Sequence, residues 1–241
     1  MAAFSLFCLL FTAGAPAAPA PAPLPDVRAL VAEERTGIEK FFGRPFAREF
    51  DIRIADSRAA LDRIAAERWK MPATECWMVA MGVADTFLML APSDWKAEAC
   101  EHDGSNAAEV RRIVAHELTH VFHGQHNPRP DFDGMDDAGW FVEGLAVLAA
   151  GQLDDARRAQ VAKATAAGEL PNSLARALSG QASYGVCGSL VEYIDRRWGR
   201  GVTFSLLSRT TNPEILAVLG VSEAELLEGW RRSLGRPAPD A

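Results

Sequence analysis

Residues 106–124 constrain the fold of this chain more than any other segment, because they predict one long amphipathic helix. Asn106 is a suitable N-cap, and Glu109 follows three residues later in a variant of the capping box. Gly124 is suited to end the helix. The apolar residues between these limits recur at helical spacing and predict a face that packs on the core: Val110, Ile113, Val114, Leu118 and Val121.

Two histidines lie beside this apolar face, in the sequence His116-Glu117-Leu118-Thr119-His120. Residues four apart lie one helical turn apart on nearly the same side, so His116 and His120 can bind one cation. A catalytic zinc ion takes three protein ligands and keeps one position for water, whose proton Glu117 can accept as general base. The pentapeptide alone is not specific, because it also fits two solvated histidines on a polar helix face.

A second predicted helix, residues 139–151, contains one acidic residue in an otherwise apolar run. Burying an unpaired carboxylate is costly, so Glu143 requires a cation nearby. This helix is separated from the histidine pair by residues 127–137, which are rich in Pro, Asp and Gly and predict an irregular loop. The sequence therefore predicts that the loop brings a second helix, with its acid, to the histidines.

The HExxH motif at His116 and the W-x-x-E-G-L-A run that begins at Trp140 resemble the gluzincin zinc metallopeptidases, and among them the peptidase MA-like group. The similarity covers residues 106–150. It implies that His116, His120 and Glu143 bind one zinc ion per chain and that Glu117 is the general base. The chain between His120 and Glu143 is slightly longer than in the shortest gluzincins, a difference that the predicted loop accounts for.

A competing third ligand is His126, which lies where a metzincin would place its third histidine, with Met135 at a suitable distance for a Met-turn. The metzincin pattern requires glycine three residues after the second histidine, and His123 stands there instead. Choosing His126 would also leave Glu143 unexplained inside an apolar helix. Glu143 is therefore favoured over His126.

The resemblance to gluzincins also implies a tyrosine near the start of a helix after the glutamate ligand, with its hydroxyl facing the oxyanion. Tyr184 begins the apolar run 184–194 and fits this role better than Tyr193, which falls inside the predicted helix. The alternative for Tyr184 is an interfacial aromatic whose hydroxyl contacts water. Asp136 or Asp137 could orient a histidine ligand, although a solvated acidic turn is favoured.

The first 25 residues predict the compartment. Residues 1–17 contain an apolar run that is too short to span a bilayer and small residues suited to cleavage, so we expect a signal peptide. Residues 18–25 predict an Ala/Pro-rich spacer, and the protein is expected to be secreted or periplasmic. Of the remaining cysteines, Cys76 and Cys100 are suited to form a disulfide, whereas Cys187 is predicted to be a buried thiol.

The order of predicted elements indicates an α+β fold of zincin-like type. Residues 26–241 are expected to form one domain, with an α/β part (26–125) that carries the HExxH helix and a helical part (126–241) that carries the third ligand. A small, mostly antiparallel sheet should lie over the HExxH helix and offer an edge strand to an extended substrate. Strands are predicted at 46–55, 77–81 and 86–90, and helices at 26–42, 57–70, 154–167, 184–198, 203–208 and, with a break at Gly220, 213–234.

The expected function is zinc-dependent hydrolysis of peptide bonds in a peptide or protein substrate. A net charge of −7 argues against binding nucleic acid or anionic membranes, and no membrane span is expected in the mature chain. An endopeptidase is favoured, because no G-x-M-E-N stretch precedes the metal helix. Two alternatives stay open: a catalytically silent metal-binding or interaction module, and a zinc amidase acting on a non-peptide substrate. The sequence does not determine the oligomeric state.

Overall fold

The computed structural model describes residues 24–234. The predicted signal peptide (1–17) and residues 18–23 of the predicted spacer lie outside this part. No helix among the described residues combines the length and the apolar character needed to cross a bilayer. The first elements, in chain order, are α1 (Val27–Phe42), β1 (Asp51–Ala55), α2 (Arg58–Trp69), β2 (Ala80–Val83), β3 (Thr86–Leu90), the 3-10 helix η1 (Pro92–Asp94), α3 (Trp95–Glu98) and α4 (Ala107–His126).

The three strands form a mixed sheet in the order β1-β3-β2. Strand β1 pairs with β3 in parallel, and β2 pairs with β3 in the antiparallel direction. The prediction of a mostly antiparallel sheet was therefore wrong, while the hairpin of β2 and β3 was correct. Parallel neighbours need a crossover, and here the chain passes through α2 between β1 and the hairpin.

The predicted strand 46–55 is shorter than expected and begins only at Asp51. Before it, Phe46 packs against α4, with its ring centroid 5.1 Å from that of Phe122. The side-chain amide of Gln125 accepts a hydrogen bond from the Arg48 backbone N–H and donates one to the Arg48 carbonyl. The Gln125 side chain thus makes the backbone hydrogen bonds that a neighbouring strand would make at Arg48. The alternation of apolar and polar residues in the sequence could not predict this contact.

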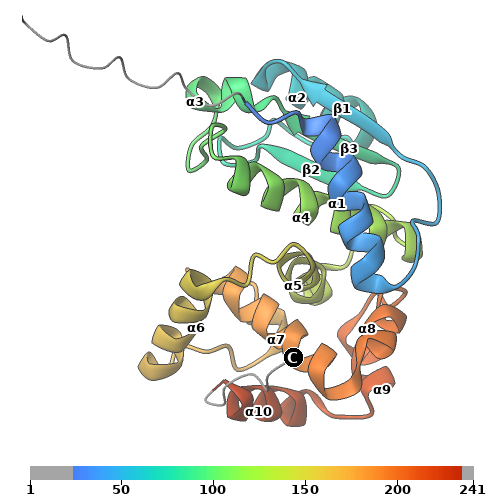
Figure 1. Cartoon of the computed structure of the whole chain (residues 1–241). Coiled ribbons are helices and arrows are strands. Elements are labelled where there is room, and N and C mark those ends of the chain that lie inside the picture. Colours follow the sequence, from blue (N-terminus) through green and yellow to red (C-terminus); the bar gives the residue numbers. More distant parts are fainter. Residues whose placement is uncertain (1–23, 235–241) are drawn as a thin grey trace, which may run out of the picture.

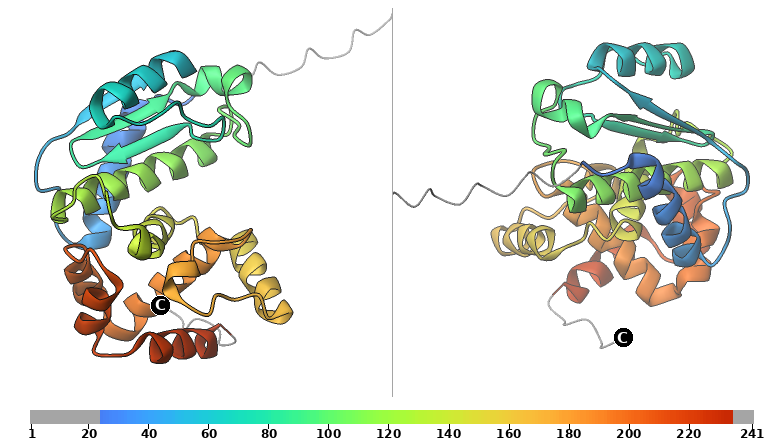
Figure 2. Two further views of the ribbon diagram at one scale, coloured as in Figure 1. Left: turned by 180° about the vertical axis from the view of Figure 1, so that it is seen from behind. Right: turned by 45° about the horizontal axis from the view of Figure 1, so that its top comes forward.

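Helix α4 lies between the sheet and the C-terminal helices (Figure 1). Helix α2 covers one face of the sheet and α4 covers the other (Figure 2). The contact between β2 and α4 depends on Gly82, because a Cβ atom there would lie 2.0 Å from the carbonyl oxygen of Glu117. Strand β2 is thereby held against the turn of α4 that carries the HExxH motif.

Both ends of α4 differ in detail from the prediction. At its start, Asn106 Oδ1 accepts a hydrogen bond from the Glu109 N–H at 3.2 Å, but the Glu109 carboxylate bonds to His102 Nδ1 at 2.8 Å, so only half of a capping box forms. At its end, the helix continues through Gly124 to His126. A Cβ atom at Gly124 would lie 2.5 Å from the Pro130 carbonyl oxygen, so glycine here permits close packing and does not end the helix.

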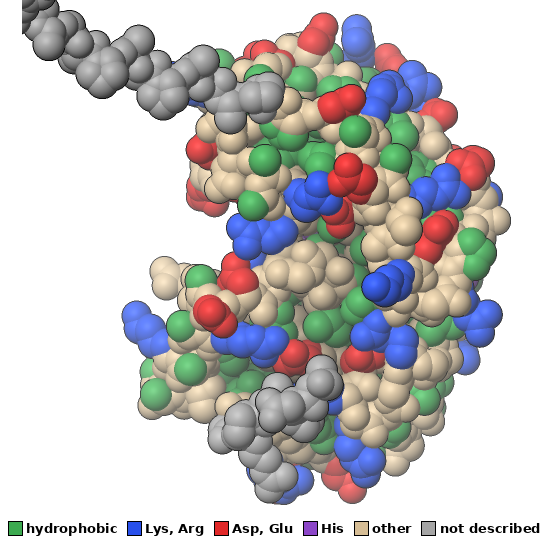
Figure 3. All heavy atoms as spheres, in the orientation of Figure 1, with side chains coloured by type: hydrophobic (Ala, Val, Ile, Leu, Met, Phe, Trp, Pro, Cys, Tyr) green, Lys and Arg blue, Asp and Glu red, His purple; other side chains and the backbone are tan. Residues whose placement is uncertain are grey.

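The C-terminal part is helical, as predicted. Helices α5 and α7 pack closely, because Gly144 lets the backbone of Cys187 approach: a Cβ atom at Gly144 would lie 2.4 Å from the Cys187 carbonyl oxygen. On one side, the surface is hollowed between the start of α4 and α6 (Figure 3). The remaining elements are η2 (Asp136–Ala138), α5 (Gly139–Ala149), α6 (Asp155–Ala167), η3 (Leu174–Arg176), α7 (Ser183–Trp198), α8 (Arg200–Leu206), α9 (Asn212–Leu219) and α10 (Glu223–Ser233).

The cysteines have the predicted arrangement. Cys76 and Cys100 form a disulfide with their Cα atoms 5.3 Å apart. Cys187 is a free, fully buried thiol on α7 that donates a hydrogen bond to the Ala177 carbonyl. The core on which these elements pack is one cluster of buried residues that extends from Val27 on α1 to Trp230 on α10.

Candidate metal centre

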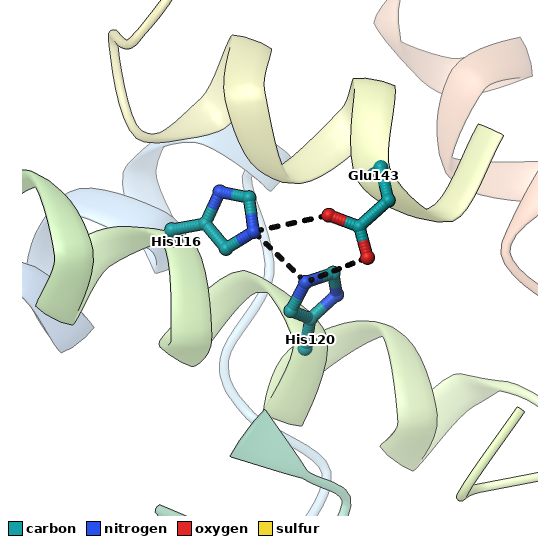
Figure 4. Close-up of side chains that lie close together, drawn as sticks. All are labelled: His116, His120 and Glu143. Atoms are coloured by element: carbon teal, nitrogen blue, oxygen red, sulfur yellow. Dashed lines mark hydrogen bonds and ion pairs between the residues drawn. The ribbon is translucent and has the colours of Figure 1, made fainter. Parts of the chain in front are cut away.

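Three side chains from two helices converge between α4 and α5 (Figure 4). The Nε2 atoms of His116 and His120 lie 3.0 Å apart. The carboxylate of Glu143 places Oε2 3.3 Å from His116 Nε2 and Oε1 3.6 Å from His120 Nε2. All three residues offer ligand atoms within 4.8 Å of one another, close enough to hold a metal ion.

These spacings match what a four-coordinate ion requires. Ligand atoms around a tetrahedral ion with bonds of about 2.1 Å lie about 3.4 Å apart. The two Nε2 atoms are 3.0 Å apart, and each lies 3.3 or 3.6 Å from a different oxygen of Glu143, so these separations are near that value. The three residues are therefore close enough to hold one cation, and a four-coordinate ion would keep one position without a protein ligand from this cluster.

The charges in the cluster also favour the binding of a cation. Burial alone would raise the pKa of Glu143, but the two histidines outweigh it through charge and hydrogen bonding and hold this pKa well below its usual range. Burial alone would lower the pKa of His120, but Glu143 outweighs it and raises this pKa. The carboxylate is thus ionised beside the two imidazoles, where a divalent cation can supply the compensating positive charge.

His116 is oriented by a residue that the sequence analysis missed. Gln152 Nε2 donates to the Arg112 carbonyl at 3.2 Å, which directs Oε1 toward His116 Nδ1 at 3.0 Å. The amide orientation requires the proton of His116 to lie on Nδ1 and leaves Nε2 free to bind a metal. Gly151, with φ of 62°, forms the turn that brings Gln152 back to α4.

The two aspartates considered for that orienting role lie elsewhere. Asp137 interacts with Asn212: its carboxylate accepts from the backbone N–H at 3.4 Å, and its carbonyl accepts from the side-chain amide. Within residues 24–234, neither Asp136 nor Asp137 hydrogen-bonds a histidine of the cluster. A neutral amide in a loop gives almost no sequence signal, so Gln152 could be found only from the fold.

The competing ligand His126 does not approach the cluster. Its Nδ1 lies 2.9 Å from the Phe122 carbonyl oxygen, and its ring stacks on Phe122. His123 is fully buried, and its Nε2 lies 3.1 Å from the Leu207 carbonyl oxygen. Burial lowers the pKa of His123 to about 3, so this histidine is uncharged at neutral pH. Neither residue belongs to the candidate metal centre.

A cleft of about 450 Å³ opens over the cluster. Glu117 and Tyr184 line it together with the three candidate ligands. The Tyr184 ring lies 6.3 Å from that of His116, between centroids, and partial burial together with the negative charges of Glu143 and Glu117 raises the Tyr184 pKa well above its usual range. The phenol therefore stays protonated and can donate a hydrogen bond. Strand β2 contributes all four of its residues to the same cleft.

No family model, curated protein or solved structure matches this chain. The resemblance to the gluzincins therefore rests on the HExxH and W-x-x-E-G-L-A motifs, and the chemistry of the residues around the cleft is the basis for inferring a function.

Proposed function

We propose that this protein is a zinc-dependent endopeptidase of gluzincin type. The main support for this proposal is that His116, His120 and Glu143 converge from two separate helices. They lie in a cleft that Glu117 also lines. Two imidazoles and a carboxylate, with a fourth position left open, form a donor set used by catalytic zinc sites. Zinc bound there would polarise the substrate carbonyl and lower the pKa of a water molecule.

The chain's own residues supply the remaining steps. Glu117 accepts the proton of the attacking water and returns it to the leaving nitrogen, so that one carboxylate serves as base and then as acid. Tyr184 donates a hydrogen bond to the oxyanion that forms when water adds to the carbonyl. Gln152 keeps His116 in the tautomer that presents Nε2 to the metal.

The edge of the sheet supports a peptide as substrate. Among residues 24–234, strand β2 is paired only with β3, and Leu90 N–H donates to the Val79 carbonyl at the start of that pairing. Antiparallel alternation then directs the backbone groups of Ala80 and Gly82 away from β3, on the side that lines the cleft. An extended peptide can pair with these groups and place its backbone over the metal centre.

The charges in the cleft support cleavage within a chain over removal of a C-terminal residue. The charged side chains that line it are Glu117, Asp136 and Glu143, and none of the described lining residues is Lys or Arg. A carboxypeptidase needs a cation for the terminal carboxylate of its substrate. The Cys76–Cys100 disulfide supports a secreted or periplasmic location, because such bonds persist in oxidising compartments.

The proposal is tested by digesting a broad peptide library with the zinc-loaded protein and with Glu117→Gln. We expect internal cleavage by the wild type, at least a hundredfold loss in the variant, and stoichiometric zinc in both. Stoichiometric zinc in a wild type that cleaves nothing would favour the silent metal-binding module. Cleavage restricted to non-peptide amides would favour the amidase.

The ligand set is tested separately by metal content. Glu143→Ala should lose most of its bound zinc, because two imidazoles alone form an incomplete site. His126→Ala is the matched control and should retain zinc, because His126 bonds to the Phe122 carbonyl away from the cluster. Zinc lost from the His126 variant and kept by the Glu143 variant would overturn the assignment.

A further inference from the structure

Exposed apolar side chains gather at the mouth of the cleft. The large apolar side chains that are exposed within residues 24–234 are Leu24, Ile54, Trp77, Leu178 and Tyr184. The last three of these line this one cleft, where Trp77 is 43% exposed and Leu178 and Tyr184 are 39% exposed. Large apolar groups left in water around a concave site mark a surface that binds apolar partners.

Trp77 and Leu178 come from different parts of the chain. Trp77 lies in the segment between α2 and β2, on the sheet side of the cleft. Leu178 lies between η3 and α7, over the start of α5, where a Cβ atom at Gly139 would lie 3.5 Å from Leu178 Cδ2. A polypeptide that enters the cleft can therefore contact apolar side chains from both the sheet side and the α5 side.

The Trp77 segment is held in place before any substrate binds. Cys76 is joined to Cys100 by the disulfide. The Arg58 guanidinium donates to the carbonyls of Cys76 at 3.0 Å and Glu98 at 2.9 Å, and also to that of Met78. A surface that is fixed in advance loses less conformational entropy on binding. Trp77 is thus suited to act as an anchor.

Much of the cleft lining away from the candidate ligands is apolar and adaptable. Four of the six methionines in the chain line it, namely Met71, Met78, Met81 and Met135. Methionine is flexible and polarizable, and it packs against apolar groups of different shapes. Such a lining favours large apolar side chains as a class over one particular residue.

We propose that the cleft selects extended polypeptide segments with large apolar side chains near the scissile bond, and that Trp77 and Leu178 determine this specificity. This inference rests on the proposed function. A strand paired with β2 directs alternate side chains to one side, so the preferred segments carry apolar residues at alternate positions. Such segments are buried in folded proteins, so the substrates are unfolded or unstructured polypeptides.

The first experiment measures binding without cleavage. Zinc-loaded Glu117→Gln is titrated with two labelled peptides of equal length and charge, one with Phe and Leu at alternate positions and one with Ser and Gln there. Adding Trp77→Ala or Leu178→Ala should weaken binding of the apolar peptide on the order of tenfold and leave the weak binding of the polar peptide unchanged. Fluorescence anisotropy gives both affinities.

Ile54→Ala is the matched control, because Ile54 is also exposed, at 36%, but lies on β1 and not in the cleft. This variant should bind both peptides as the parent does. Thermal unfolding midpoints and an intact disulfide, checked in every variant, separate a local effect from misfolding. Equal affinity for the two peptides, or unchanged affinity in both the Trp77 and Leu178 variants, would overturn the inference.

A second experiment uses the active wild type on one disulfide-rich protein, either native or reduced, alkylated and freed of reductant. The unfolded form should be cleaved at least tenfold faster, with cuts near apolar residues. Cleavage at the same rate in exposed polar loops of the native form would overturn the inference and leave the proposed function standing. Selective binding of the apolar peptide by a protein that cleaves nothing would overturn the proposed function and would support only that Trp77 and Leu178 select apolar segments.

Discussion

His116 Nδ1 lies 3.0 Å from the side-chain oxygen of Gln152. This contact links the candidate ligand His116 to the loop that follows α5, the helix that carries Glu143. Gln152 is buried, and its amide nitrogen is held by the Arg112 carbonyl. The first candidate ligand is thus oriented by a group on a different element from its own.

Gln152→Ala should weaken zinc binding by about 10- to 100-fold, the range typical for loss of a group that orients a metal-bound histidine. Gln152→Glu keeps an acceptor for His116 Nδ1–H and should lose much less affinity. Competition with a chromophoric chelator measures both constants. Equal affinity in the alanine variant and the wild type would show that the contact does not position His116.

Tyr184→Phe should lower kcat roughly a hundredfold and change KM little, because the phenol would donate to an oxyanion that exists only after water has added. Tyr193→Phe is the control, since the Tyr193 ring packs edge-on against Trp198, with centroids 5.8 Å apart. Steady-state kinetics on one cleaved peptide measures both. An unchanged kcat in the Tyr184 variant would remove its catalytic role.

Gly82→Ala should destabilise the fold by about 1–3 kcal/mol, because the new methyl group would collide with the Glu117 carbonyl and force β2 away from α4. It should also impair cleavage, since it displaces the turn that carries the proposed base. Gly201→Ala in α8 meets no atom within 4 Å and should be neutral or slightly stabilising. Denaturant unfolding of the two variants provides the comparison, and equal stabilities would contradict the close contact.

Acid should destabilise the protein through His123. Its pKa is about 3 in the folded chain and returns to its ordinary 6.5 on unfolding, so between these values the unfolded state binds more protons. The free energy of unfolding therefore falls as the pH drops below about 6.5, by up to about 1.4 kcal/mol per pH unit. Above that pH His123 has no such effect.

His123→Gln removes this titration and keeps a donor for the Leu207 carbonyl. Between about pH 7 and about pH 5, the metal-free variant should lose roughly 2 kcal/mol less stability than the metal-free wild type. Urea unfolding at the two pH values measures the difference. Parallel losses in the two proteins would show that His123 is not kept neutral by burial.

The features that could be predicted from sequence depend on local patterns. Asn106 caps α4, as its position before an amphipathic run indicated. The convergence of Glu143 with the histidines could be anticipated because a lone acid in an apolar helix needs a cation.

The missed features depend on contacts between distant segments. The parallel pairing of β1 with β3 is set by the path through α2, and alternation within a strand does not identify its partner. Gly124 was expected to end α4, yet it serves close packing against Pro130. Gln152 is a third case, because its role appears only after the chain turns back at Gly151.

The division of the ligands between α4 and α5 has a thermodynamic consequence for the whole chain. An ion held by His116, His120 and Glu143 would fasten the sheet-bearing part to the C-terminal helices, and it would dissociate when these parts separate. Resistance to unfolding then rises with the free concentration of the ion, by about 2.7 kcal/mol at a hundred times its dissociation constant. Metal supply would thus regulate the lifetime of the folded protein as well as its chemistry.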